Sequence, residues 1–298
     1  MNLEQLVNDL SKQPNKTVAL AAAADKGVIE AVHKAIRIQL ASFILYGEKH
    51  ELKQMLADEG LIESPSLQIV DAQSEQEASR MAVKAVRNGE ADVLMKGMVS
   101  TSVILKEVLN KEYGLRKGKI LSHVAAFDIE GYERLIFVTD SGMNIEPDLT
   151  QKGEIVKNAV AIARSIGVEL PKVVPLAAVE VVNPAMQATL DAAALTQMNK
   201  RGQISDCFID GPLALDNAIS EKAAEQKGIQ SEVAGKADIL LVPSIEVGNA
   251  LYKSLVYFAH AKVGGVIAGA KAPIVLTSRA DSSESKVYSI ALAVSSAK

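Results

Sequence analysis

The sequence predicts an α/β protein, and three observations lead to this class. Short apolar runs alternate along the chain with segments whose apolar residues recur at helical spacing. Hydrophobic residues occupy 48% of the 298 positions and aromatic residues only 4%, a profile typical of helices packed on buried parallel strands. The length is sufficient for two domains of ~100–200 residues each. We therefore expect two α/β lobes.

The first third of the chain carries a regular alternation of strand and helix. Four apolar runs recur about every 25 residues, and each is followed by a charged segment with apolar residues at helical spacing. This interval accommodates a strand and a crossover helix, so right-handed connections make these strands parallel. The predicted strands are residues 17–22, 42–46, 67–71 and 92–95.

The rhythm changes after Ser122. Residues 124–127 and 134–138 are apolar runs joined by a short polar link that contains Gly131, which predicts an antiparallel pair. Alternation then resumes, with helices predicted over 150–166 and 282–294 and strands near 173–175, 207–209, 239–242 and 274–276. We expect one lobe over 1–118 plus 280–298 and the other over 119–279.

Charge and cysteine content exclude several classes of protein. The 32 Lys and Arg residues against 36 Asp and Glu residues give a net charge of -4, without the basic excess of a nucleic-acid binder. The single cysteine, Cys207, cannot form an intramolecular disulfide, and its apolar strand favours an inert core thiol. No window reaches the ~18 apolar residues of a membrane span, and residues 1–20 lack a signal-like pattern. We expect a cytoplasmic protein without a membrane or nucleic-acid partner.

Polar residues directly after predicted strands are candidate ligand contacts, because open α/β sheets bind ligands beyond the carboxyl ends of their strands. The first candidate begins with Lys96 and Gly97, and the next helix starts with Ser100 or Thr101 as its N-cap. Backbone N–H groups at that helix start, together with Lys96, suit a phosphate. Simple helix capping with a solvated Lys96 is an equal alternative.

The polar residues of two further turns could either stabilise the local backbone or contact a ligand. Asp140, Ser141 and Asn144 predict a turn before the helix at 150 rather than a site. Asp210 stands at a strand end beside Gly211, where it could contact a ligand, and Asp216 either does the same or favours a helix N-terminus.

Two more candidates follow the last predicted strands. Glu246, Asn249 and Lys253 share one face of a helix that starts after residue 243, which indicates either a site or a solvated face. Ser278 and Arg279 leave a buried strand together, and the Arg fork suits phosphate or carboxylate. Asp281 or Ser282 then caps the last helix.

Metal and dinucleotide motifs are absent from the sequence. It contains no Cys-x-x-Cys pair, His-Glu-x-x-His run or P-loop, and Gly264, Gly265 and Gly269 do not form a dinucleotide fingerprint. We therefore predict no metal site. The four histidines lack metal-ligand spacing, and we expect a structural role for His123 at the start of a strand; they are His33, His50, His123 and His260.

Several of these motifs, in this order, resemble the phosphate acyltransferases, the phosphotransacetylase and phosphotransbutyrylase family. The resemblance covers nearly the whole chain and is nearer to the phosphotransbutyrylase branch. The C-terminal part of the resemblance comprises 237–243, Glu246, Gly248-Asn249, Tyr252-Lys253, Gly264-Gly265 and 277–279. The earlier part comprises Lys96-Gly97, Ser100-Thr101, 139–142, 210–212 and 216–218.

The resemblance implies a fold like that of the isocitrate and isopropylmalate dehydrogenases, with two α/β lobes and the active site in a cleft between them. It also implies a homodimer. It implies reversible transfer of a short or branched acyl group between CoA and inorganic phosphate, with acyl-CoA and phosphate as substrates and no bound cofactor. Ser278 and Arg279 match the family's Ser-Arg pair, which binds phosphate and stabilises charge developing on the carbonyl. The implied substrate contacts are Lys96, Gly97, Ser100, Thr101, Asp210, Asn249 and Lys253.

One position departs from the family pattern. Phosphotransacetylases carry an Asp shortly after the Ser-Arg pair, proposed as a base toward the CoA thiol, and the matching position here is Ser285. Glu284 is the expected base, with Asp281 or no carboxylate as the alternatives. A phosphate acetyltransferase and a non-catalytic CoA or acyl phosphate-binding protein stay open as other functions. A dehydrogenase of the same fold is disfavoured because no group of Asp residues suits its metal.

Overall fold

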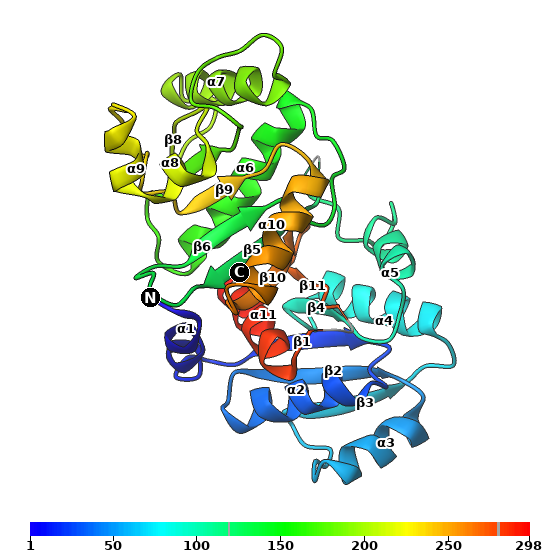
Figure 1. Ribbon diagram of the computed structural model, residues 1–298. Helices are drawn as coiled ribbons and strands as arrows, with labels where there is room; N and C mark the ends of the chain where they lie inside the picture. Colours follow the sequence, from blue (N-terminus) through cyan, green and yellow to red (C-terminus); the bar gives the residue numbers. More distant parts are fainter. Residues whose placement is uncertain (119, 279–280) are drawn as a thin grey trace. The chain divides into compact units, whose positions relative to one another are not determined.

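A computed structural model describes residues 1–118, 120–278 and 281–298 of the chain (Figure 1). The chain divides into two compact units. The first unit comprises Leu3–Gly118 and Gly264–Lys298, and the second comprises Met1–Asn2 and Lys119–Val263. The first unit is therefore built from both ends of the sequence, whereas the second is almost continuous.

The first unit is a largely parallel sheet with helices packed on it. Strands β3, β2, β1, β4 and β11 lie side by side in that order, all parallel, and β10 pairs antiparallel with β11. The strands are β1 (Lys16–Ala21), β2 (Ala41–Gly47), β3 (Leu67–Asp71), β4 (Val93–Lys96), β10 (Lys262–Ala268) and β11 (Ile274–Val275). The helices are α1 (Leu3–Leu10), α2 (Lys26–Arg37), α3 (Lys49–Asp58), α4 (Glu75–Asn88), α5 (Thr101–Val108) and α11 (Ser283–Ser296).

Local chemistry sets the bounds of these helices. Asp25 caps α2 by accepting from Val28 N at 2.9 Å, and Ser74 caps α4 by accepting from Glu77 N. Gly89 ends α4 with φ of 79°, in the left-handed region that glycine adopts without a steric penalty. Helix α2 leads from β1 to β2, and α4 leads from β3 back across to β4. Because these connections run in opposite directions, right-handed crossovers place α2 and α4 on opposite faces of the sheet.

Residues from the end of the chain complete the core of the first unit. Helix α11 packs against α2 and α1, as the red and blue ribbons of Figure 1 show. All residues from Lys286 to Val294 are buried. Gly264 on β10 meets the α11 backbone, where a Cβ would lie 2.8 Å from the carbonyl of Tyr288. Only glycine allows this close approach.

The second unit combines antiparallel and parallel strands. Strand β5 (Ser122–Asp128) pairs antiparallel with β6 (Ile136–Thr139), and β6, β9, β7 and β8 follow in parallel order. The other strands are β7 (Lys172–Pro175), β8 (Phe208–Ile209) and β9 (Ile239–Leu241). The helices are α6 (Leu149–Ser165), α7 (Gln187–Lys200), α8 (Leu215–Ile219), α9 (Glu221–Gln226) and α10 (Ile245–Tyr257).

The α/β class, the parallel strands of the first third and the antiparallel pair after Ser122 are confirmed. The sequence pattern did not reveal β10, whose apolar run is diluted by two glycines, or the helices α1, α7 and α9. Residues 264–279 were expected in the second lobe, but their strands pair with each other and with β4 of the first unit. Of the helices that the structure describes, none is long and apolar enough to span a membrane.

Candidate functional site

The carboxyl ends of β1, β4 and β11 form one edge of the first unit's sheet. Ala21 of β1 is opposite Lys96 of β4, and Val275 of β11 is opposite Met95. The residues that follow these strand ends therefore emerge together. The sheet register thus brings two sequence-predicted groups to the same edge: Lys96 with Gly97, and Ser278.

Lys96 is buried at this edge and orders the loop that follows it. Its Nζ donates to the carbonyl oxygens of Gly97 at 3.0 Å and Val99 at 3.1 Å. An ammonium carries three donors, and in the interior it requires such partners to offset the loss of water. The alternative of a solvated Lys96 is wrong, since the residue is only 9% exposed.

Gly97 allows the loop to touch the neighbouring strand end. Its N–H donates to Ala21 O at 2.8 Å, and the N–H of Met98 donates to Ala22 O at 2.7 Å. A Cβ on Gly97 would lie 2.1 Å from Ala22 O, so no other residue fits without displacing the backbone. Ala22 itself has φ of 53°, a left-handed conformation at this edge.

The start of α5 is the next part of this edge. Ser100 is the N-cap, since its Oγ accepts from Val103 N at 3.3 Å and lies 3.0 Å from the hydroxyl of Ser102. Thr101 is the first helical residue, and both Ser100 and Thr101 are exposed. A helix start with exposed hydroxyls offers N–H donors and a positive dipole end to an anion.

Ser278 is exposed after β11 and is held by Asp281. The N–H of Ser278 donates to Asp281 Oδ2 at 2.7 Å, and the N–H of Asp281 donates to Ser278 O at 3.2 Å. Arg279 lies outside the described residues, so its predicted role stays a prediction.

The start of α11 settles the capping question and locates the expected base. Ser282 is the N-cap, and its Oγ accepts from the N–H of Ser285 at 3.0 Å. Glu284 is exposed in the first turn and accepts a hydrogen bond of 2.9 Å from the Tyr288 hydroxyl. Asp281 is engaged with Ser278, which leaves Glu284 as the carboxylate with an exposed face.

In the second unit, α10 packs on the turn after β6. Gly248 is the helix residue at this contact, where a Cβ would lie 2.8 Å from Ser141 Cα. Asn249 and Lys253 are exposed one residue and five residues further along. The pKa of Glu246 lies below its ordinary value because its own backbone N–H and the Ser244 hydroxyl donate to its carboxylate.

The turn itself is a hydrogen-bonded unit, as its composition predicted. Asp140, only 2% exposed, accepts from the N–H groups of Gly142 and Met143 at 2.9 Å each, and from the Asn144 amide. Ser141 Oγ lies 2.8 Å from His123 Nδ1. Sequence reasoning gave His123 a structural role but did not find Ser141 as its partner, because pairing across β5 and β6 needs the strand register.

Asp210 is half-buried at the end of β8. Its Oδ1 accepts from Gly211 N at 3.0 Å, and its own N–H donates to Val173 O at 3.2 Å. The Gly211-Pro212 peptide bond is cis. Asp216 is exposed in α8, with its Oδ2 4.0 Å from Lys227 Nζ. Both carboxylates therefore lie at the surface of the second unit.

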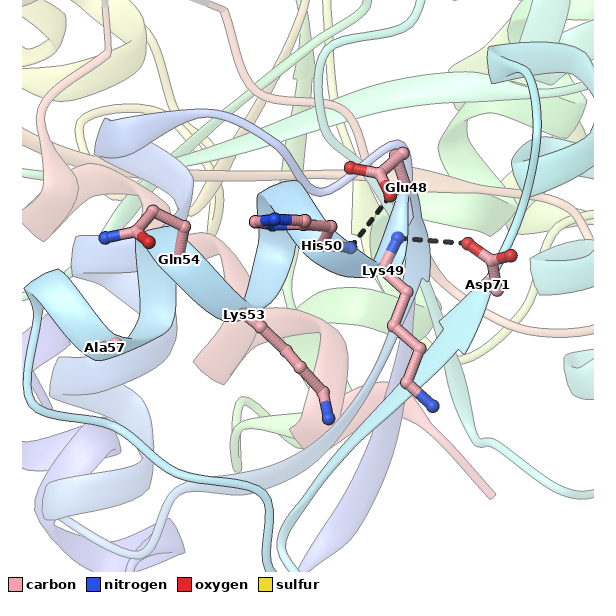
Figure 2. A pocket seen from close by; sticks show the side chains of 7 residues that line it. All are labelled: Glu48, Lys49, His50, Lys53, Gln54, Ala57 and Asp71. Carbon is pink, nitrogen blue, oxygen red and sulfur yellow. Dashed lines mark hydrogen bonds between the residues drawn. The ribbon is translucent and has the colours of Figure 1, made fainter.

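A separate hollow of about 590 Å³ lies beside the start of α3 in the first unit (Figure 2). Glu48 caps α3 by accepting from His50 N at 2.8 Å, and the N–H of Lys49 donates to Asp71 Oδ1 at 3.0 Å. Lys53 Nζ lies 3.1 Å from Glu63. Acidic side chains of the protein thus already pair with the Lys49 and His50 backbone N–H groups and with the Lys53 ammonium.

No metal-binding group was found in the described part of the chain. Among residues 1–118, 120–278 and 281–298, no three His, Cys, Asp or Glu side chains are gathered so that they could hold a metal ion.

Comparison with known proteins adds a family match. Residues 68–294 match the model of the phosphate acetyl/butaryl transferase family. The chain is 55% identical to the probable phosphate butyryltransferase of Bacillus subtilis, covering 99% of this chain and 97% of that protein. It is 49% identical to the phosphate butyryltransferase of Clostridium beijerinckii (98% and 96% covered) and 48% identical to the phosphate acetyltransferase of Thermotoga maritima (98% of each covered).

Solved structures are similar as well. A branched-chain phosphotransacylase from Enterococcus faecalis superposes with a TM-score of 0.84 at 37% identity, covering 94% of this chain and 98% of that one. A 4-hydroxythreonine-4-phosphate dehydrogenase from Klebsiella pneumoniae shares the fold, with a TM-score of 0.58 at 13% identity, covering 96% and 100%. The predicted likeness to a dehydrogenase-type fold is confirmed.

Proposed function

Because the chain belongs to the phosphate acetyl/butaryl transferase family, we propose that it transfers a short or branched acyl group between CoA and inorganic phosphate. The products are an acyl phosphate and free CoA. The observation that carries the proposal is the shared edge of β4 and β11, where the Lys96 loop, the start of α5 and Ser278 emerge together. These groups combine one cation with several N–H and hydroxyl donors, which suits a phosphate.

The reaction needs charge stabilisation above all. A phosphate oxygen attacks the thioester carbonyl, a C–O bond forms, and the carbonyl oxygen becomes an oxyanion. The C–S bond then breaks, and CoA leaves with the electron pair as a thiolate that takes up a proton. Fixed donors and cations that face the oxyanion and the phosphate lower this barrier. Ser278 and Arg279 are the proposed donors to phosphate and oxyanion.

The remaining substrate contacts are proposed residue by residue. Lys96 supplies a fixed positive charge and orders the loop that carries Gly97. Ser100 and Thr101 present hydroxyl and backbone donors at the start of α5. On the second unit, the proposed contacts are Asp210, Asn249 and Lys253.

Glu284 is the proposed base toward the CoA thiol in the direction of acyl-CoA formation. Its exposed position supports this role, whereas Asp281 is occupied by the Ser278 N–H. A free thiol with pKa about 8.5 is only a few per cent thiolate near pH 7, so a base accelerates its attack. Glu284→Gln should flatten the acidic limb of the kcat/KM profile for CoA, and an unchanged limb would rule out Glu284 as the base.

We propose a cytoplasmic homodimer. A single cysteine, Cys207, supports a reducing compartment. Exposed apolar residues on and directly after α10 support a covered surface, which we call the α10 apolar surface: Val247 is 43% exposed, Tyr257 66% and Phe258 85%. A second copy of the chain is the proposed cover.

The deciding experiment measures release of free CoA thiol from butyryl-CoA, isobutyryl-CoA and acetyl-CoA, each with and without phosphate. Phosphate-dependent release supports the transferase, and we expect the butyryl or isobutyryl substrate to be fastest. Acetyl-CoA as the fastest substrate would favour a phosphate acetyltransferase, the name carried by the Thermotoga maritima relative. CoA binding without thiol release would overturn the proposal in favour of a binding protein.

A further inference from the structure

Lys286 is a buried lysine that the proposed reaction does not use. It lies in the first turns of α11 and is only 3% exposed. Its Nζ donates to the backbone carbonyl of Asp281 at 2.5 Å. Burying an ammonium forfeits its hydration, and a methionine of similar length would avoid that loss. Packing alone therefore does not explain why a charged ammonium is buried at this position.

The carbonyl that Lys286 binds belongs to the residue that holds Ser278. Asp281 accepts from the Ser278 N–H through Oδ2 at 2.7 Å and donates its own N–H to Ser278 O at 3.2 Å. Two hydrogen bonds thus fix Ser278 to Asp281, and a third fixes Asp281 to Lys286. The chain of contacts runs from a buried helix to an exposed serine.

The buried end of this chain has little freedom to move. Residues from Lys286 to Val294 along α11 are buried, and α2 packs against α11. The start of α2 lies close to the ammonium, since a Cβ on Gly27 would be 3.7 Å from Lys286 Nζ. Lys286 is therefore enclosed by packed helices, and its hydrogen bond extends that fixed position to Asp281.

We infer that Lys286 is a positioning residue that acts through Asp281 to fix the backbone of Ser278. The inference rests on the proposed function in one respect: an effect on turnover requires Ser278 to contact the reacting groups. Misplacement of a reacting group by about 1 Å can lower turnover by about 10²-fold. A modest displacement of this exposed turn would therefore be measurable.

The first test compares Lys286→Met with a matched control, Lys34→Met. Lys34 also contacts the start of α11, donating to Ser283 Oγ at 2.7 Å, but it is exposed and does not touch Asp281. We expect Lys286→Met to lower kcat about 10- to 100-fold with little change in the KM for butyryl-CoA, and Lys34→Met to leave both near wild type. Equal kinetics for the two variants would overturn the inference.

The second test changes the Asp281 side chain, which accepts from Ser278, and leaves its backbone carbonyl, which accepts from Lys286. It keeps the inference testable if Lys286→Met does not fold. Asp281→Asn retains a side-chain oxygen for the Ser278 N–H, so most activity should remain. Asp281→Ala loses that acceptor and should reproduce the loss of kcat. If Asp281→Ala turns over like wild type, Asp281 does not position Ser278 and the inference fails.

A third test does not depend on turnover. Hydrogen exchange of the Ser278 amide should be faster in Lys286→Met and Asp281→Ala than in wild type or Lys34→Met, because the bond to Asp281 protects that N–H. Unchanged exchange would contradict the inference even if activity falls. If the wild type releases no thiol but exchange responds as expected, the proposed function fails and the positioning role of Lys286 stands.

Discussion

Gly248 on α10 and Asp140 after β6 are in backbone contact: a Cβ on Gly248 would lie 2.6 Å from the carbonyl oxygen of Asp140. The helix that carries Asn249 and Lys253 therefore packs on a turn in which Asp140 accepts from the backbone N–H groups of the two residues after Ser141. The position of these two side chains depends on the absence of a side chain at residue 248.

Gly248→Ala should destabilise the protein by about 1–3 kcal/mol, because the added methyl forces α10 away from the turn. Activity should fall further than stability explains, since Asn249 moves with the helix. Urea unfolding and steady-state kinetics measure the two effects. Gly153→Ala is the matched control, a helical glycine whose Cβ would meet its nearest atom at 3.7 Å, and it should be neutral or stabilising. Equal behaviour of the two variants would contradict the prediction.

The Lys152–Asp191 pair in the second unit should respond asymmetrically to substitution. The two side chains are 7% and 8% exposed and lie 2.6 Å apart, and Asp191 also accepts from Gln187 at 2.8 Å. Asp191→Leu leaves a buried ammonium unpaired and should lower the free energy of unfolding by about 3–5 kcal/mol, whereas Lys152→Met/Asp191→Leu together should recover most of the loss.

The exposed pair Lys157–Glu154 on the same helix is the control, and Glu154→Gln should change stability by less than about 1 kcal/mol. Denaturant midpoints at one pH measure all four proteins. A double variant no more stable than Asp191→Leu would show that the pair's surroundings, and not the unpaired charge, determine the cost.

Cys207 should make the protein less stable at alkaline pH. Burial, reinforced by the nearby charge of Asp206, raises the pKa of its thiol from 9.0 to about 11. Since the folded pKa lies above the unfolded one, the stabilising contribution is complete below pH 9 and is lost as pH rises through about 11. Unfolding free energies across this window should fall less steeply for Cys207→Ala than for wild type.

The same burial has a practical use. A thiol-reactive dye at pH 8 should label native wild-type protein slowly and urea-unfolded protein rapidly, because only thiolate reacts and Cys207 is 6% exposed. Rapid labelling of the native protein would show that the thiol is accessible, against the structure.

Arg279→Ala should lower kcat about 10²- to 10³-fold, the effect of losing one preorganised donor to an oxyanion. The reason is the proposed contact of its guanidinium with phosphate and the developing charge. Arg80→Ala, on an exposed face of α4, serves as the control for loss of a surface arginine. Near-normal turnover in Arg279→Ala would remove this residue from the proposed site.

Phe258→Asp should convert the proposed dimer to monomer by placing a charge on the α10 apolar surface. Ile62→Asp is the control, since Ile62 is an apolar residue of the first unit that is 80% exposed. Light scattering coupled to size exclusion gives the mass of each variant. A dimer that persists in Phe258→Asp would exclude this surface as the interface.

The sequence alone was sufficient for elements whose signal is local. The apolar runs at 17–22 and 92–95 predicted β1 and β4 correctly. Short runs of β-branched and apolar residues between polar segments are typical of buried strands. The helix start at Ser100 and the turn at Asp140 followed from side chains that bond to their own neighbours. The hydrogen-bond partners of such side chains lie within a few residues in the sequence.

Features that depend on distant partners could not be predicted. Ser141 contacts His123 only because β5 and β6 pair in one register, and Gly264 is required only because α11 crosses β10. From the sequence, Lys286 would be expected at the surface, because it lies in a polar helix start. It is buried because α2 and α11 pack together. The residues 264–279 were assigned to a lobe by their order in the sequence, which carries no information about the strands with which they pair.

The composition of the first unit from both ends of the sequence has a consequence for synthesis. Strand β4 has β11 as its neighbour, and β11 is made about 180 residues later, at 274–275. Until those residues leave the ribosome, β4 presents an unpaired edge of the kind that invites association with other chains. The second unit, which is nearly continuous in sequence, can fold before the C-terminal residues of the first unit have been synthesised. A nascent chain that ends before residue 264 therefore exposes this edge of β4 to other chains.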